Sequence, residues 1–170
     1  MKKKCFFFDR DGVLNDENGY ISKLKYFKIK KNTGKAIRLL NENNYLVIII
    51  TNQAGIGRGL IKKKELNLLH NILKKKVKKD GGIINDIFFC PYHPIYGIGK
   101  YKKNSYDRKP NPGMIKKAIK KWNIDAKKSF MIGDKLKDKL ASINAGVRFR
   151  YKSKKIDLHK QIKIMLSKNS

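Results

Sequence analysis

Residues 4–15, with the sequence KCFFFDRDGVLN, decide the fold that this chain is expected to adopt. The four apolar residues 5–8 are typical of a strand buried on both faces of a sheet. The run ends at Asp9 and Asp11, and open α/β sheets bind their ligands at the carboxyl ends of their strands. Side chains two positions apart along a strand point to the same side, so these two carboxylates can converge on one point. Their mutual repulsion favours a divalent cation between them.

Two other interpretations of the DRDG segment are weaker. Asp and Gly are common in turns, so these four residues alone only suggest a ligand site. An EF-hand calcium loop also begins with Asp-x-Asp, but it needs an oxygen ligand at its fifth position and Gly at its sixth. Val13 and Leu14 stand at those positions, which excludes an EF-hand.

The composition predicts one globular domain over residues 1–170. The chain is 41% hydrophobic, and none of its apolar runs approaches the ~20 residues that a membrane helix needs. The two cysteines, Cys5 and Cys90, provide no disulfide framework, so we expect a cytoplasmic protein. We also expect a monomer with no membrane partner.

The net charge of +29 could indicate a nucleic-acid partner. However, only six of the 42 basic residues are Arg, the side chain that recognises phosphates and bases with a bidentate fork. The lysines are also scattered through every segment. We interpret the charge as a general preference for lysine and expect no nucleic acid to bind.

Hydrophobic periodicity predicts strands that alternate with helices along the chain. After the first strand, strands are expected at 45–50, 83–90, 129–132 and 147–151. An irregular loop is expected at 16–31, a glycine-rich loop at 54–60 and a long loop at 91–112. Helices are expected from the Asn32-Thr33 cap to residue 40, and over 61–79, 112–122, 136–144 and 156–166. This alternation predicts a three-layer α/β fold with a mainly parallel sheet.

Polar residues follow three of these strands. Asp9 and Asp11 follow the first, Thr51 and Asn52 follow the second, and Asp134 follows the fourth, with Asp138 four residues later. Lys109 lies in the long loop before residue 112. Carboxylates, a hydroxyl, an amide and a lysine around one cation are the parts of a phosphoryl-transfer site.

In this order the motifs resemble the haloacid dehalogenase (HAD) superfamily of aspartate-nucleophile phosphatases. The resemblance is closer to one of its families, the D-glycero-D-manno-heptose 1,7-bisphosphate 7-phosphatases with their histidinol-phosphatase relatives. It spans residues 6–146 and rests on DRDGVLN with Gly19-Tyr20, then TNQAGIGRG, CPYHP, RKPNPGM and GDKLKD. It implies a Rossmann-like HAD fold without a large cap domain, acting on a sugar bisphosphate for heptose nucleotide and lipopolysaccharide precursor synthesis.

The resemblance also implies a role for each motif. Asp9 would be the nucleophile that forms an aspartyl-phosphate, and Asp11 would be the general acid and base. Mg²⁺ would be held by Asp9, the backbone carbonyl of Asp11, and Asp134. Thr51, Asn52 and Lys109 would stabilise the phosphoryl group, and Asp138 would orient Lys109 or Asn52. Substrate contacts would come from Glu17, Asn18, Gly19, Tyr20, Gln53, Ala54, Arg108 and Lys135.

One family feature is missing from this chain. Relatives often carry a structural zinc in the loop before RKP, in the pattern C-x-H…C-x-C. Cys90 is present here, but Tyr92, Ser105 and Asp107 occupy the other three ligand positions, and His93 is one residue out of place. A single thiolate makes a poor tetrahedral site, so we expect no zinc.

Two alternative substrates stay open. A histidinol-phosphate phosphatase would share all five motifs. A nucleic-acid 3′-phosphatase has similar TNQ and RKP segments and would suit the positive charge. Arg10 between the aspartates, the segment around Gly19 and the lack of a kinase P-loop argue against this second alternative.

Overall fold

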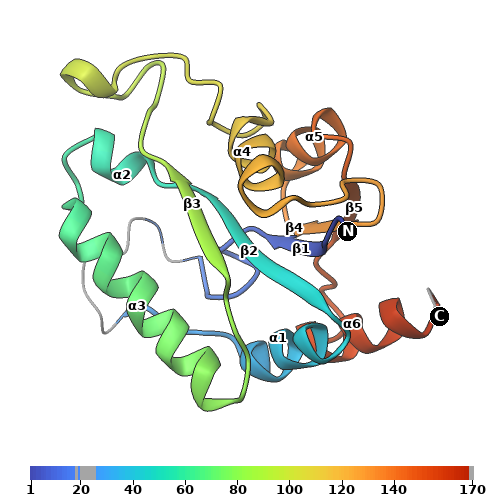
Figure 1. Cartoon of the computed structure of the whole chain (residues 1–170). Helices are drawn as coiled ribbons and strands as arrows, with labels where there is room; N and C mark the ends of the chain where they lie inside the picture. Colours follow the sequence, from blue (N-terminus) through green and yellow to red (C-terminus); the bar gives the residue numbers. More distant parts are fainter. Residues whose placement is uncertain (18, 20–25, 169–170) are drawn as a thin grey trace.

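The computed structural model describes residues 1–17, 19 and 26–168 of the chain (Figure 1). Its strands are β1 (Lys4–Phe8), β2 (Tyr45–Asn52), β3 (Asp86–Cys90), β4 (Phe130–Gly133) and β5 (Arg148–Tyr151). Its helices are α1 (Thr33–Glu42), α2 (Ala54–Gly57), α3 (Lys63–Lys79), α4 (Gly113–Trp122), α5 (Leu136–Asn144) and α6 (Leu158–Ser167), with a 3₁₀ turn η2 (Gly99–Tyr101).

The five strands form one parallel sheet in the order β3-β2-β1-β4-β5. The strand β1 lies at the centre, where Phe8 pairs with Ile49 of β2 and Ile132 of β4. Because all strands run in one direction, the residues that follow β1, β2 and β4 meet at a single edge of the sheet. The predicted α/β class and parallel sheet are confirmed.

Helices cover both faces of the sheet (Figure 1). Phe6 and Phe8 lie on one face in a core shared with α1, α3 and α6, whereas Cys5 and Phe7 lie on the other in a core with α4 and α5. This alternation follows from the strand period of two, and it explains why residues 5–8 are all apolar. Within the described residues, no large cap domain follows any strand.

The structure corrects two local predictions. Residues 54–57 form one helical turn, α2, within the segment predicted as a glycine-rich loop. The Arg58 amide closes this turn by donating to the carbonyl of Ala54 at 3.0 Å. The strand β3 begins at Asp86, three residues later than predicted. The regular strand pairing stops before β3 at Asn85, because the Val47 amide donates to the side-chain Oδ1 of Asn85, at 2.8 Å, in place of a backbone carbonyl.

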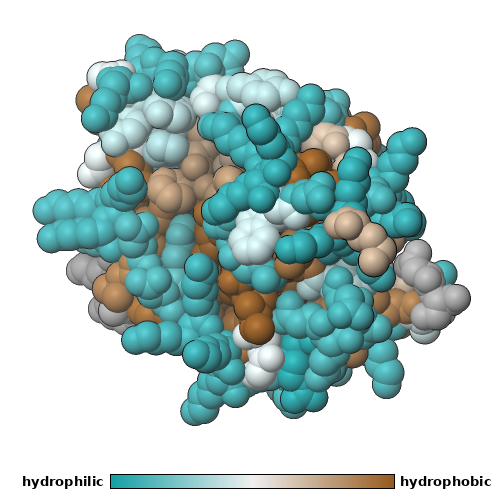
Figure 2. All heavy atoms as spheres, in the orientation of Figure 1, coloured by the Kyte–Doolittle hydropathy of each residue, from teal (hydrophilic) through white to brown (hydrophobic). Residues whose placement is uncertain are grey.

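Hydrophilic side chains cover most of the face seen in Figure 2, with smaller apolar areas between them. This is the distribution expected when scattered lysines are solvated. No helix within the described ranges has both the length and the apolar character needed to cross a membrane.

Candidate active site

Asp9 lies at the bottom of the site, immediately after β1. The Asp9 amide donates to the carbonyl of Ile132 at 3.0 Å, which continues the pairing with β4 by one residue. Its Oδ1 accepts a bond from the Arg10 amide at 2.7 Å and an ion pair from Lys109 at 2.9 Å. Burial, with the nearby Asp138 charge adding to it, raises the pKa of Asp9 to about 6 although Lys109 opposes the rise.

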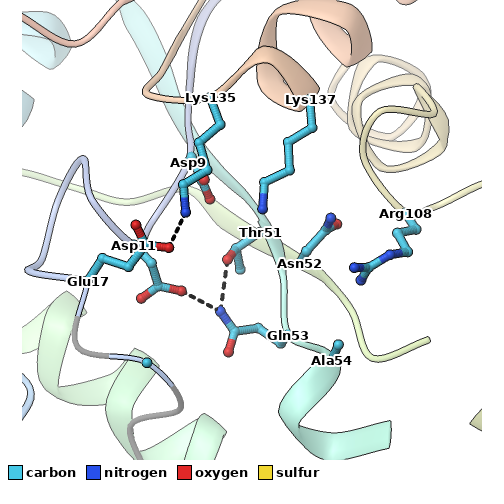
Figure 3. A pocket seen from close by; sticks show the side chains of 11 residues that line it. Asp9, Asp11, Glu17, Thr51, Asn52, Gln53, Ala54, Arg108, Lys135 and Lys137 are labelled. Carbon is cyan, nitrogen blue, oxygen red and sulfur yellow. Dashed lines mark hydrogen bonds and ion pairs between the residues drawn. The ribbon is translucent and has the colours of Figure 1, made fainter. Parts of the chain in front are cut away.

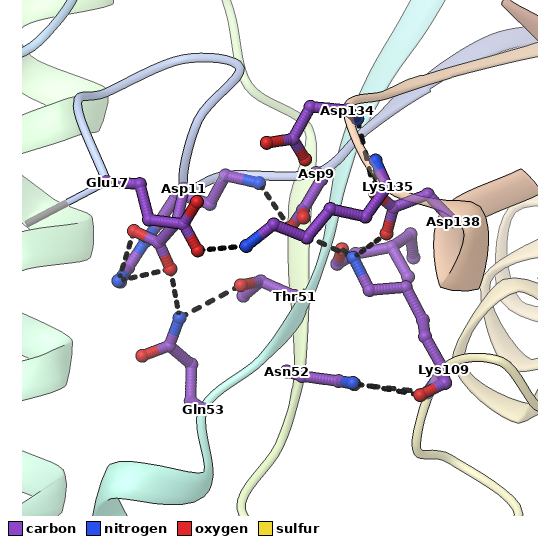
Figure 4. Close-up of polar contacts among 12 residues, drawn as sticks. Asp9, Asp11, Glu17, Thr51, Asn52, Gln53, Lys109, Asp134, Lys135 and Asp138 are labelled. Atoms are coloured by element: carbon purple, nitrogen blue, oxygen red, sulfur yellow. Dashed lines mark hydrogen bonds and ion pairs between the residues drawn. The ribbon is translucent and has the colours of Figure 1, made fainter. Parts of the chain in front are cut away.

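Lys109 connects three parts of the fold through its buried ammonium group (Figure 4). Nζ lies 2.9 Å from Asp9 Oδ1, 2.7 Å from Asp138 Oδ1 and 2.8 Å from the carbonyl oxygen of Ile50 in β2. Burial alone would lower the pKa of Lys109, but the two carboxylates raise it above its ordinary value. The ammonium group therefore stays charged, and all three of its donors are used.

Asp138 holds Lys109 from the first turn of α5. Its Oδ1 pairs with Lys109, while its Oδ2 accepts bonds from the amides of Asp134 and Lys135 at 3.2 and 3.1 Å. A carboxylate at this end of a helix is stabilised by unpaired amides and by the helix dipole. Gly133 makes room for it, since a Cβ there would lie 2.3 Å from Asp138 Cβ. The predicted contact between Asp138 and Lys109 is therefore present.

Asp11 is held by three side chains. The guanidinium of Arg10 donates to both carboxylate oxygens at 2.9–3.1 Å, and Asn15 Nδ2 and Gln53 Nε2 add bonds of 2.9 and 2.8 Å. Although burial would raise the pKa of Asp11, the Arg10 charge and these bonds lower it below its ordinary value. The Asp11 carboxylate is therefore ionised and fixed in orientation.

Thr51 and Asn52, the last two residues of β2, and Gln53 after them line the opposite wall of the site. Thr51 accepts a 2.9 Å bond from Gln53 Nε2, so Gln53 connects Thr51 to Asp11 (Figure 3). Asn52 exchanges two bonds with the backbone of Lys109, through its Nδ2 at 3.0 Å and its Oδ1 at 3.1 Å. This exchange positions the long loop against the end of the sheet.

Carboxylate oxygens of Asp9, Asp134 and Asp138 lie within 4.8 Å of one another. Oδ1 of Asp134 is buried and has no hydrogen-bond partner in the described part of the chain, so it is available to a cation. Burial, followed by the Asp138 charge, raises the pKa of Asp134. A donor set of carboxylate oxygens without His or Cys fits a hard cation such as Mg²⁺.

A pocket of about 300 Å³ opens above these groups (Figure 3). Glu17 and Lys135 form an ion pair at its rim (Figures 3 and 4). Lys135, the residue before α5, and Arg108 of the long loop extend into the pocket (Figure 3). The pocket is lined by Asp9, Asp11, Glu17, Gly19, Thr51, Asn52, Gln53, Ala54, Arg108, Lys135 and Lys137. The predicted Asn18 and Tyr20 lie outside the described residues.

Sequence analysis missed Lys137, whose side chain also enters this pocket (Figure 3). Its position two residues after Lys135 in GDKLKD was the available signal, but one lysine does not stand out in so basic a chain. The contact between Arg10 and His70, which are 60 positions apart, could not be read from the sequence either.

The four positions of the expected zinc loop make other contacts. Cys90 is a buried free thiol whose pKa is raised by burial, and the buried Ser105 hydroxyl hydrogen-bonds to it. Ser105 Oγ also accepts a bond from the Asp107 amide at 3.2 Å, and the Asp107 carboxylate pairs with Lys117. The Tyr92 ring packs 5.9 Å from the Tyr101 ring. This donor set does not fit zinc.

Comparisons with known proteins identify the family of this chain. A sequence profile of the family described as "Polynucleotide kinase 3 phosphatase" matches residues 4–161. The D-glycero-beta-D-manno-heptose-1,7-bisphosphate 7-phosphatase of Haemophilus ducreyi is 40% identical over 149 residues, which are 87% of this chain and 81% of that protein. The D-glycero-alpha-D-manno-heptose-1,7-bisphosphate 7-phosphatase of Photorhabdus laumondii is 41% identical over 146 residues, 86% of this chain and 80% of that protein.

A solved structure shows the same fold. The D,D-heptose 1,7-bisphosphate phosphatase from B. bronchiseptica, complexed with magnesium and phosphate, matches with a TM-score of 0.81 at 24% identity. The match covers 97% of this chain and 99% of that one. The chain is therefore a phosphoric monoester hydrolase of the HAD superfamily and belongs to the family of the D-glycero-D-manno-heptose-1,7-bisphosphate 7-phosphatases.

Proposed function

We propose that this protein removes the 7-phosphate of D-glycero-D-manno-heptose 1,7-bisphosphate, with Mg²⁺, through an aspartyl-phosphate intermediate. The observation that carries the proposal is the buried group of Asp9, Lys109 and Asp138 beside Asp134, at the base of a pocket with a cationic rim. The names of the relatives supply the substrate. Arg108, Lys135 and Lys137 on the rim suit a substrate with a second anionic group.

The first step is attack by Asp9 on phosphorus. Both side-chain contacts of Asp9 fall on Oδ1, which leaves Oδ2 without a donor among the described residues and available for attack. Because an anion attacks an anion, the Lys109 charge lowers the barrier by offsetting the negative charge at the reacting centre. Thr51 Oγ1 and the Asn52 amide would hold phosphate oxygens.

Because Asp11 is ionised in this arrangement, it would first take up a proton on one carboxylate oxygen. It would give that proton to the leaving alcohol and then take one from the water that hydrolyses the intermediate. To do so it must leave part of its present network, in which Arg10, Asn15 and Gln53 occupy both oxygens. Gln53 contacts Thr51 as well as Asp11, so phosphate binding at Thr51 would also change the surroundings of Asp11.

Asp9, Asp134 and the backbone carbonyl of Asp11 would hold Mg²⁺, with Asp138 kept for Lys109. The ion would supply positive charge that stabilises the transferring phosphoryl group. The buried, unpartnered Oδ1 of Asp134 supports this ligand set. Gly12 leaves room for the Asp134 carboxylate, since a Cβ at this position would lie 2.2 Å from Asp134 Oδ2.

We place the reaction in heptose nucleotide and lipopolysaccharide precursor synthesis, and the protein in the cytoplasm as a monomer. The two free buried cysteines are in keeping with a reducing compartment. The pathway assignment follows from the proposed substrate, and the monomeric state stays a prediction.

The test compares kcat/KM for three phosphate esters at saturating Mg²⁺: heptose 1,7-bisphosphate, histidinol phosphate and a 3′-phosphorylated oligonucleotide. We expect the bisphosphate to be preferred by at least 100-fold. The oligonucleotide is included because the matching family profile names such an activity and because the chain carries a charge of +29. A preference for either of the other two esters would overturn the substrate assignment.

A further inference from the structure

Arg10 is a buried cation that contacts a residue outside the pocket. Its Nε and one terminal nitrogen, Nη2, are used by Asp11, and its other terminal nitrogen, Nη1, lies 3.2 Å from Nε2 of His70 in α3. The guanidinium carbon also lies 5.6 Å from the centre of the Phe27 ring. Arg10 and His70 are only 2% and 7% exposed, so water cannot easily replace either partner.

The chemistry of the two groups fixes the direction of this hydrogen bond. Arginine has only donors and does not lose its proton in proteins, so Nη1 donates and His70 Nε2 accepts. The proton of a neutral His70 must then be on Nδ1. Burial, with the Arg10 charge second, lowers the pKa of His70 to about 3, in keeping with a neutral acceptor.

We propose that His70 is a positioning residue of this enzyme, which fixes the plane of the Arg10 guanidinium and, through it, the Asp11 carboxylate. Among the described residues, the side-chain partners of Asp11 are Arg10, Asn15 and Gln53, so its hydrogen-bonded connection to α3 runs through Arg10 and His70. The inference rests on the proposed role of Asp11 as general acid. His70 itself does not line the pocket of the proposed active site.

The location of His70 separates this role from core packing. Leu73 and Val77, further along α3, belong to the main core, and His70 does not. The His70 ring lies 6.0 Å from the ring of Phe89 in β3. His70 also lines a surface hollow of about 270 Å³. Substitutions at His70 can therefore change the Arg10 contact with little effect on the main core.

The experiment compares His70→Gln with His70→Met. Both side chains are unbranched and of equal length, but only Gln places a strong acceptor near the position of Nε2. Val77→Ala is the control for a destabilised α3 that keeps the Arg10 contact. Each variant is assayed with saturating Mg²⁺ on heptose bisphosphate, whose alkoxide needs a proton to leave, and on p-nitrophenyl phosphate, whose phenolate leaves without one.

We expect His70→Met to lower kcat/KM for heptose bisphosphate roughly tenfold, which is about 1.4 kcal/mol of barrier. For p-nitrophenyl phosphate the loss should be less than about twofold, since kcat/KM reports only steps up to cleavage of the P–O bond. His70→Gln should retain most of the wild-type value with both esters. Val77→Ala should lower Tm without a difference between the two esters.

Three results would overturn the inference while leaving the phosphatase assignment intact. They are equal losses in His70→Gln and His70→Met, equal losses with both esters, and no loss in His70→Met. Absence of phosphatase activity in the wild-type protein would instead refute the proposed function and, with it, this inference.

Discussion

Replacing Lys109 by Met should destabilise the protein through the two carboxylates that it leaves behind. Asp9 and Asp138 are 5% and 0% exposed, and both lie within 2.9 Å of Lys109 Nζ. Removing one partner from a buried ion pair costs about 3–5 kcal/mol. At roughly 2–4 °C per kcal/mol for a chain of this size, Tm should fall by about 6–20 °C.

The loss should depend on pH in a defined direction. The pKa of Asp9 is already raised to about 6, and burial raises it while Lys109 opposes the rise, so removing Lys109 raises it further. A carboxyl with a higher pKa in the folded state than in the unfolded state destabilises the protein above its folded pKa. As pH falls through that pKa, the folded protein takes up the proton first and the penalty shrinks.

Thermal unfolding in EDTA at pH 8 and pH 5.5 tests both expectations. Lys117→Met is the matched control, since Lys117 also pairs with an aspartate but is 60% exposed, so its Tm should change by less than about 3 °C. Adding Asp138→Asn to Lys109→Met should recover part of the loss, because Asn removes the charge and keeps an acceptor for the helix amides. A Tm change below about 2 °C for Lys109→Met, or a deficit that grows at pH 5.5, would refute the reasoning.

Four further outcomes are expected. Asp9→Asn should abolish turnover and keep a folded protein, and residual activity within about tenfold of wild type would rule out Asp9 as nucleophile. EDTA should remove activity, and added Mg²⁺ should restore it without a refolding step; full activity in magnesium-free buffer would contradict the ligand set. Gly12→Ala should weaken Mg²⁺ binding at least tenfold in a titration, because its φ of +83° is strained for Ala and its Cβ would meet Asp134 Oδ2. Metal analysis of untagged protein should find no stoichiometric zinc; one zinc per chain bound through Cys90 would show that Ser105 and Asp107 do not exclude it.

The arrangement of the site follows from strand order, and this part could be predicted. Residues that end β1, β2 and β4 had to meet at one edge once the sheet was known to be parallel. The contact between Asp138 and Lys109 was also expected, although their separation of 29 positions gave no geometric reason for it. The single-domain boundary at residues 1–170 and the roles of the individual site residues stay predictions.

The parts that could not be predicted depend on how elements rotate and where loops end. The rotation of α3 about its own axis decides whether His70 faces Arg10. Leu66, Leu69 and Leu73 form a broad apolar stripe, which determines that rotation only approximately. Ala54–Gly57 contains two glycines, which disfavour a helix, yet backbone bonds after β2 close one turn there. Lys137 enters the pocket because of where α5 begins, and helix boundaries are the least certain feature of a sequence.

Buried ion pairs and exposed charges divide this site into two regions with different tolerance to change. Lys109 crosslinks the floor of the site between Asp9 and Asp138, so we expect substitutions there to lose stability and, if the proposed mechanism holds, activity as well. The charged rim is built from side chains on loops and on the first turn of α5. The side chains of Glu17 and Lys135, which both lie outside the helices, are 45% and 40% exposed. Changes at the rim cost little folding energy. A chain of this design can therefore acquire a new phosphate ester as substrate by exchanging rim residues alone, with its phosphoryl-transfer chemistry inherited unchanged.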